Sequence, residues 1–165
     1  MKTTAVVFEL FEKTIRTASW EALTCAIELT ADHESSINLI TIGNNPGESA
    51  SRISEQTGRH VIAIDIESGG SYNSEQTKSI LVNICQELEV TNLCLAGTTQ
   101  GLDYGPGLAV RLGLPCFTGV EAILQDGSDL HLRRSVYGGK VMEKCAIHES
   151  GAIIVIQPGT FKPFD

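Results

Sequence analysis

The residues best suited to chemistry lie in one short stretch, GTTQG at 97–101, which combines two glycines with two hydroxyl side chains. The stretch follows an apolar run and precedes a segment of helical periodicity. Backbone amides at a helix N-terminus, helped by the helix dipole, attract anions. A phosphate or nucleotide site is therefore one interpretation, and its candidate cofactor-binding residues are Gly97, Thr98, Thr99, Gly101 and Asp103.

A tight turn capped by a hydroxyl group is the second interpretation of the same stretch. The lysine of a Walker loop is missing, and so is the GxGxxG spacing of a dinucleotide-binding turn. Asp103 also brings a negative charge to the place where an anion would bind. The residue pattern leaves both interpretations open.

Two other stretches carry weaker signals. SGGS at 68–71 is similar to the pyrophosphate loop of ATP pyrophosphatases, but it lacks the Asp-Ser that follows there, so we expect a flexible loop. Glu9 and Glu12 follow the first apolar run, at the mouth of the crevice that the fold is expected to form. Charged residues are common in such loops, and we expect these two to be solvated rather than catalytic.

No arrangement of residues predicts an enzyme or a metal site. The chain has no GxSxG nucleophile motif, and its four histidines lack partners at metal-ligand spacing. The five cysteines form no CxxC pair, which argues against a thiol-based redox protein. We expect the cysteines to be buried as small apolar residues.

The hairpin sequence YGGK at 137–140 predicts a different kind of site. A tight turn needs residues with positive φ, which the two glycines supply, but it does not need the flanking Tyr137 and Lys140. A tyrosine combines a large apolar area with a polar tip, which suits an interface anchor. An edge-strand tyrosine that covers its own sheet explains the pattern equally well.

Length and charge narrow the class of protein. The 165 residues fit one domain, at 1–165, with a sizeable core. The net charge of -8 would repel the phosphate backbone of a nucleic acid. The sequence has no apolar run near the ~20 residues of a membrane span and no signal-peptide pattern. We therefore expect a cytoplasmic protein without nucleic-acid or membrane partners.

The elements that position these residues alternate between strands and helices over the first two-thirds of the chain. Apolar runs predict strands at 5–8, 37–42, 61–66 and 93–96. Amphipathic segments predict helices from Ser19 to near 32, from Asn45 as N-cap to Gly58, at 74–88, and from near 103 to Gly113. In such a sheet the crevice forms where the winding order reverses, between the first and fourth strands.

Four further strands, at 120–124, 130–136, 141–147 and 152–156, follow with turn signals between them. Turns at 126–127, 138–139 and 150–151 predict an antiparallel meander. The expected fold class is α/β, a three-layer doubly wound and mostly parallel sheet with an antiparallel extension at one edge.

Four segments, at 97–106, 108–113, 137–140 and 156–161, together resemble the amino-terminal domain of the electron transfer flavoprotein α subunit, in family order and with roughly family spacing. The resemblance implies a fold like that of the adenine nucleotide α-hydrolase group and a heterodimer with a β-type subunit. It implies that FAD sits mainly in a separate carboxy-terminal domain. The chain ends four residues after the motif at 158–161, so we expect that domain to be absent.

The resemblance also implies a role, which is a non-catalytic scaffold that assembles with a β-type subunit or a separate FAD domain. The family usually has arginine where this chain has Leu102 and Gly107, and the AMP site of such flavoproteins belongs to the β subunit. AMP binding here remains possible, as does a homo-oligomer. The candidate partner-interface residues are Tyr137, Gly138, Gly139, Lys140 and Arg111. The alternative is a nucleotide-sensing module of the universal stress protein type.

Overall fold

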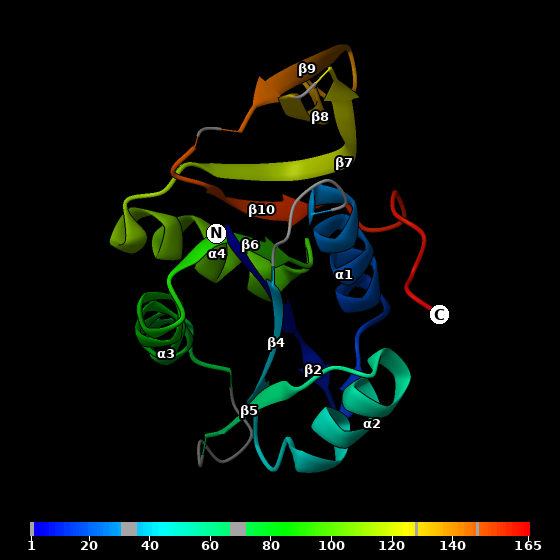
Figure 1. Cartoon of the computed structure of the whole chain (residues 1–165). Helices are drawn as coiled ribbons and strands as arrows, with labels where there is room; N and C mark the ends of the chain where they lie inside the picture. The colour runs from blue at the N-terminus through cyan, green and yellow to red at the C-terminus, as the bar shows by residue number, and fades with distance from the viewer. Residues whose placement is uncertain (1, 31–35, 67–71, 128, 148) are drawn as a thin grey trace.

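The computed structural model describes all of the chain except residues 1, 31–35, 67–71, 128 and 148 (Figure 1). The predicted end of the first helix near residue 32 and the expected flexible loop at 68–71 lie outside the described residues. None of the described helices has both the length and the apolar character that a membrane crossing requires.

An eight-stranded sheet forms the middle of the molecule, in the order β5-β4-β1-β6-β10-β7-β8-β9. A separate pair of short strands, β2 and β3, forms a hairpin directly after β1. The strands are β1 (Thr3–Phe8), β2 (Leu10–Phe11), β3 (Thr14–Ile15), β4 (Ser36–Gly43), β5 (Val61–Asp65), β6 (Val90–Leu95), β7 (Cys116–Asp126), β8 (Asp129–Val136), β9 (Val141–Ala146) and β10 (Ala152–Ile156).

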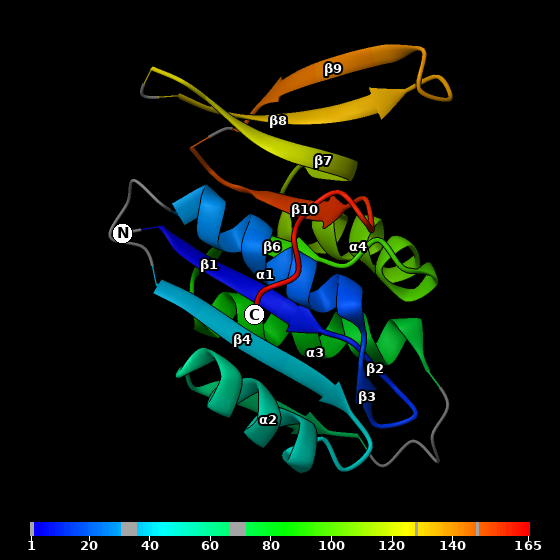
Figure 2. The ribbon, with the colours of Figure 1, turned by 90° about the vertical axis from the view of Figure 1, so that its right-hand side faces the viewer.

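Four helices cover the two faces of the sheet. They are α1 (Thr17–Thr30), α2 (Gly47–Thr57), α3 (Ser74–Glu87) and α4 (Thr99–Leu112). Figure 2 shows α1 and α2 in front of the sheet and α3 and α4 behind it, so each face has its own apolar core. The predicted α/β class, with three layers and a mostly parallel sheet, is confirmed.

Strand β10 corrects the predicted topology. It does not continue the meander from β9 but lies between β6 and β7, parallel to both. All five of its residues are buried, which a strand at the edge of a meander would not be. The predicted turn at 150–151 is instead the start of a crossover, where Gly151 (φ 94°) passes so close to Thr91 that a Cβ atom would lie 1.9 Å from its carbonyl oxygen.

The antiparallel extension consists of β7, β8 and β9, as predicted except for its last strand. Asp126 pairs with Asp129 at one hairpin, and Val136 pairs with Val141 at the other. Tyr137 itself has a positive φ of 52°, as do both glycines that follow it. Figure 1 shows this extension standing above the body of the molecule, at the opposite end from α2.

Several predicted helix boundaries shift by a few residues. Helix α1 begins at Thr17 rather than after Ser19, whose hydroxyl accepts a hydrogen bond from the Glu9 amide instead of capping the helix. Helix α2 has Pro46, not Asn45, as its N-cap. Helix α4 begins at Thr99, four residues before the predicted start, because Thr98 caps it. Gly58 and Gly113 end their helices in the left-handed conformation, as predicted.

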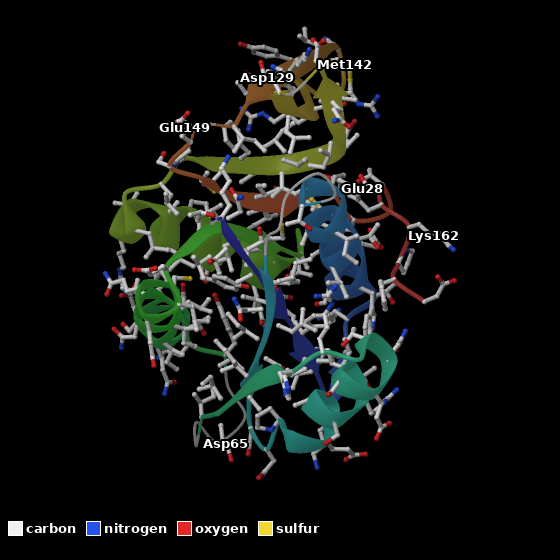
Figure 3. The ribbon with its side chains drawn as sticks, viewed as in Figure 1. Glu28, Asp65, Asp129, Met142, Glu149 and Lys162 are labelled. Carbon is white, nitrogen blue, oxygen red and sulfur yellow. The ribbon has the colours of Figure 1, made fainter. Side chains whose placement is uncertain are left out.

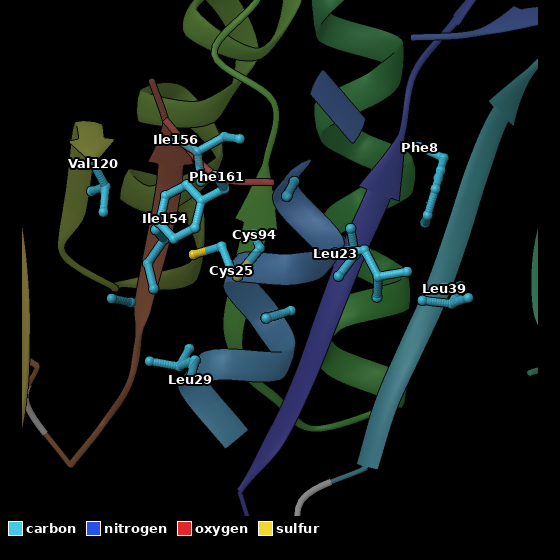
Figure 4. Close-up of a cluster of buried hydrophobic side chains, with 14 of the residues drawn as sticks. Phe8, Leu23, Cys25, Leu29, Leu39, Cys94, Val120, Ile154, Ile156 and Phe161 are labelled. Carbon is cyan, nitrogen blue, oxygen red and sulfur yellow. The ribbon is translucent and has the colours of Figure 1, made fainter. Parts of the chain in front are cut away.

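The cysteines divide into two groups. Cys25, Cys85 and Cys94 are buried, as expected, and Figure 4 shows Cys25 and Cys94 within the core between α1 and the sheet. Cys116 and Cys145 are only half-buried, because they lie toward the open antiparallel extension.

Candidate functional site

The start of helix α4 is a hydroxyl-capped turn. The Thr98 hydroxyl accepts a hydrogen bond from the Gly101 amide at 3.2 Å, which satisfies one of the free amides of the first helical turn. The same hydroxyl donates to Oε2 of Glu9 at 2.5 Å. The predicted meeting of the loop after Phe8 with the loop after Ala96 is thereby confirmed, since this bond joins them.

Both glycines of the GTTQG stretch are needed for close backbone packing. A Cβ atom on Gly97 would lie 2.1 Å from the carbonyl oxygen of Ile156. One on Gly101 would lie 2.0 Å from the carbonyl oxygen of Ala96. The glycine content therefore has a structural cause that requires no bound anion.

Glu9 is buried and not solvated, which corrects the expectation for this residue. It is only 6% exposed, and its backbone is held at both ends. Its amide donates to the Ser19 hydroxyl at 2.9 Å, and its carbonyl accepts from the Arg16 amide at 3.0 Å. Burial raises the pKa of the Glu9 carboxyl, while the Thr98 hydrogen bond, the Arg16 charge and the nearby Gly101 amide partly oppose that rise. Glu12, by contrast, is exposed as expected.

A second carboxylate lies on the first turns of α4. Asp103 accepts a hydrogen bond from the Tyr72 hydroxyl at 2.8 Å, and burial together with this carboxylate raises the pKa of Tyr72 to about 12. Glu9 and Asp103 thus both lie where an anion would approach the helix N-terminus. The cofactor-binding role of Gly97, Thr98, Thr99, Gly101 and Asp103 stays a prediction, and this charge distribution favours the capped turn over an anion site.

Beside this turn lies a cavity of about 390 Å³, at the carboxyl ends of β1 and β4. Val7, Phe8 and Ile42 are among its apolar lining residues. Its polar and charged lining residues include Glu12, Lys13, Asn44, Asn45 and Tyr72. Its volume falls within the range of roughly 300–1,000 Å³ that is typical of small-molecule sites. The predicted crevice lay between the first and fourth strands, β1 and β6, whereas this cavity lies over β1 and β4, on the other side of β1. Gln100 and Tyr104 of α4, the helix that follows β6, also line it.

Tyr104 is one of several cavity residues for which the sequence predicts no role. It is 2% exposed, and its hydroxyl accepts and donates no hydrogen bond among the described residues. Burial raises its pKa well above the usual value, and the Glu9 charge adds to that rise. Tyr104 follows Gln100, another lining residue, by four positions, so both lie on one face of α4. This spacing is the feature of the sequence that could have placed Tyr104 beside the cavity.

The predicted interface residues of the hairpin at 137–140 are exposed. Tyr137 is 80% exposed, so it does not cover its own sheet. Met142 on the following strand is 52% exposed, and Figure 3 shows it at the upper end of the molecule. Arg111 instead binds Glu75 of α3 at 2.5 Å, within the chain. The structure thus leaves the interface role of these residues as a prediction.

The described residues contain no cluster of histidine, cysteine and carboxylate side chains that could hold a metal ion. The start of α4 also does not fit the pyrophosphate of a flavin dinucleotide. The Gly101 amide already donates to the Thr98 hydroxyl, and the carboxylates of Glu9 and Asp103 belong to the same region. Any FAD that serves this domain is therefore better held by other residues than these.

The sequence matches the family model described as Electron transfer flavoprotein domain over residues 4–165. No curated protein sequence matches the chain. The family match extends from β1 to the segment that follows β10. Proteins of this family are flavin-associated electron carriers rather than catalysts. The chain belongs to the electron transfer flavoprotein domain family.

Proposed function

We propose that this chain is an α-type amino-terminal domain that acts as a non-catalytic scaffold in an electron transfer flavoprotein. The observation that carries the proposal is the exposed apolar surface of the β8–β9 hairpin. Tyr137, Val141 and Met142 are 80%, 48% and 52% exposed, although all three are large apolar or aromatic side chains. The three side chains lie on one projecting hairpin, with Val141 and Met142 on opposite faces of β9. Exposed apolar side chains on such a projection are typical of a protein contact.

The backbone of the same hairpin supports this proposal. Strand β9 is the last strand of the sheet and pairs only with β8 among the described strands. The outer backbone groups of an edge strand are free to bind another polypeptide. We infer that a β-type subunit, or a separate flavin domain, covers this edge and its three side chains.

The flavin belongs to the complex in this proposal. FAD supplies the redox chemistry when it is bound by the assembled protein. This chain contributes a rigid surface. Hydrogen bonds within the chain hold its glycine-rich turn, and the turn packs closely against the backbone of the sheet. We place the assembly in the cytoplasm as a heterodimer.

Co-purification tests the proposal. The tagged full chain, produced in its native source, is expected to bring down a β-type or flavin-domain polypeptide together with flavin absorbance. The double variant Tyr137→Ser with Met142→Ser should lose this partner while keeping its thermal stability. Arg59→Ala, beyond α2 at the other end of the sheet, is the matched control and should retain it. Recovery of free chain alone, or equal recovery from the double variant, would refute the scaffold role.

A nucleotide-binding module is the second candidate, and the cavity at the ends of β1 and β4 is the observation that favours it. Titration with AMP, ATP and flavin nucleotides tests this candidate, because a ligand that binds only the folded state raises the unfolding temperature. The carboxylates of Glu9 and Asp103 weaken the case for a phosphate-bearing ligand. No thermal shift at millimolar nucleotide would dismiss this candidate.

A further inference from the structure

The charge of this chain is distributed unevenly between the body and the antiparallel extension. The extension, residues 116–146, contains four basic and four acidic side chains, so it is neutral as a whole. The rest of the chain therefore carries the whole net charge of -8. Figure 1 shows the extension standing away from the body. An acidic partner is repelled by the body and meets no such net repulsion at the extension.

Two ion pairs within the extension engage half of its charges. Arg134 binds Glu143 at 2.5 Å, and Lys144 binds Asp126 at 2.7 Å. The two charges of each pair largely cancel, so neither pair attracts a charged partner strongly.

The other two acidic side chains of the extension lie away from the β8–β9 turn. Glu121 belongs to β7, and its carboxylate accepts a hydrogen bond from the Ser135 amide at 3.2 Å. Asp129 is the first residue of β8, at the β7–β8 turn. No carboxylate therefore follows Arg134 along the hairpin until Glu143, which that arginine already binds.

Arg133 and Lys140 are the two cations of the extension that remain. Both are exposed, and in the part of the chain that the structure describes neither makes an ion pair or a side-chain hydrogen bond. Arg133 also lies directly opposite Lys144 in the register of β8 and β9. Like charges in directly opposed positions repel each other, and Asp126 compensates only the lysine. A carboxylate from outside the chain would relieve this repulsion.

Apolar area lies beside these cations. Alternate residues of a strand share a face, so Arg133, Ser135, Met142 and Lys144 form one face of the hairpin, which we call the hairpin face. The Ser135 hydroxyl donates to the Met142 sulfur at 3.2 Å, in agreement with this register. Met142 is 52% exposed and Tyr137, at the turn, is 80% exposed. The end of the hairpin thus combines exposed apolar side chains with positive charge.

We propose that the hairpin face, together with Tyr137 and Lys140 of the turn, binds an acidic protein surface on which carboxylates surround an apolar centre. This proposal rests on the scaffold role and names the chemistry of the partner in it. A nucleic acid or an anionic membrane presents negative charge over an extended area, which the acidic body of the chain would also face. A local acidic patch on a protein can contact the hairpin alone.

Two hexapeptides with the same apolar centre test the proposal. Both are acetylated and amidated, and a Leu-Phe pair is flanked on each side by two glutamates in one peptide and by two glutamines in the other. The full chain, labelled with ¹⁵N, is titrated with each peptide by NMR. At an ionic strength of about 0.01 M we expect the glutamate peptide to shift the amides of residues 133–144 and to bind about fivefold more tightly than the glutamine peptide.

Salt provides the control for this titration. The preference for the glutamate peptide should shrink at about 0.15 M, because the Debye length falls from about 30 to about 8 Å. Absence of shifts with the glutamate peptide, or equal binding of the two peptides at low salt, overturns the proposal.

A charge reversal locates the contact. Arg133→Glu should weaken binding of the glutamate peptide about fivefold, whereas Arg133→Lys keeps the charge and should bind nearly like the parent chain. Glutamate opposite Lys144 replaces a repulsion by an attraction, so the variant should fold. Arg59→Glu changes the net charge equally but lies beyond α2, at the other end of the sheet, and it should bind like the parent chain. Equal weakening by the two glutamate variants would mean that only net charge matters, which contradicts the proposal.

Other occupants of the hairpin face give different results. Retention of the chain on phosphatidylserine vesicles without shifts from the glutamate peptide would indicate an anionic membrane and would overturn the proposal. Shifts of the amides of residues 133–144 on concentrating the chain alone would indicate a second copy, with the same consequence. The scaffold role is tested separately by co-purification. A partner recovered equally with the parent chain and with Arg133→Glu would refute the acidic contact and leave the scaffold role intact, whereas recovery of no partner would refute the scaffold role itself.

Discussion

The parallel and antiparallel parts of this sheet differ in how far their side chains are buried. Strand β10, in the parallel part, is buried along its whole length, whereas β9 alternates between exposed and half-buried residues. Helices cover both faces of the parallel strands, and a cavity lies at the carboxyl ends of β1 and β4. In the antiparallel part, Val120 of β7 and Leu132 of β8 are still buried, but no residue of β9 is, and Figure 2 shows β8 and β9 standing away from the helices. The first part buries its apolar side chains, and the second leaves several of them exposed.

The largest expected loss of stability comes from a substitution at a close backbone contact in the parallel part of the sheet. Gly101→Ala forces a Cβ atom to within 2.0 Å of the Ala96 carbonyl oxygen. We expect a loss of about 3 kcal/mol or more in the free energy of unfolding, because the backbone must move in a packed region. Urea denaturation measures this loss.

Gly47→Ala is the control for that substitution. Gly47 is the first residue of α2, and an added Cβ atom would meet nothing within 4 Å. Alanine should be neutral there or stabilise the protein by up to about 1 kcal/mol. A tolerant Gly101→Ala variant would contradict the structural account of the glycine-rich turn and would favour a ligand-related reason for its glycines.

A pair of side-chain truncations compares the two parts of the sheet directly. Ile154→Ala in β10 removes a fully buried side chain and should cost about 3 kcal/mol. Val141→Ala in β9, at 48% exposure, should cost less than about 1 kcal/mol. Equal losses, measured by denaturation in the same buffer, would mean that β9 is buried in solution, as in an oligomer of this chain.

How much of this contrast could be predicted depends on the strand. The alternation of β8 and β9 and their glycine turn were visible in the sequence, because a half-exposed hairpin depends on local signals. The place of β10 was not predicted, since strand order depends on contacts between distant residues. The run Ala152–Ile156 is apolar at every position, which is typical of a strand covered on both faces, and this is the feature of the sequence that agrees with a place inside the sheet.

The candidate site was predicted only in part for the same reason. The sequence located Thr98 and the meeting of two loops, since strand ends converge in a parallel sheet. It did not predict that Glu9 is buried, because a carboxylate after a strand usually faces water. Its burial depends on Ser19, Arg16 and Thr98, which come together only in the folded chain.

Removal of the unpaired hydroxyl of Tyr104 should have a smaller effect, and it should raise the stability rather than lower it. Tyr104→Phe removes a buried polar group without a partner and leaves the ring in place. We expect the free protein to gain about 1 kcal/mol of stability, since the desolvation cost of that hydroxyl disappears. Thermal denaturation without ligand checks the gain. A loss of stability would show that the hydroxyl is already satisfied by water.

The smallest expected effect is the pH dependence that Glu9 imposes on the parallel part. Its folded pKa is raised above the ordinary value of 4.5, so the folded state binds the proton more tightly than the unfolded chain, and stability falls as pH rises through the folded pKa. Arg16, Tyr104 and Tyr72 also face this carboxyl, but the two tyrosines titrate only at much higher pH.

The variant Glu9→Gln has no titrating group at this position, so its stability relative to the parent chain should increase from acidic to neutral pH. Asp126→Asn in the antiparallel part should show the reverse trend, because Lys144 holds the pKa of Asp126 below its ordinary value. If the stabilities of the two variants, each relative to the parent chain, changed with pH in the same direction, the proposed electrostatic difference between the two parts of the sheet would be wrong.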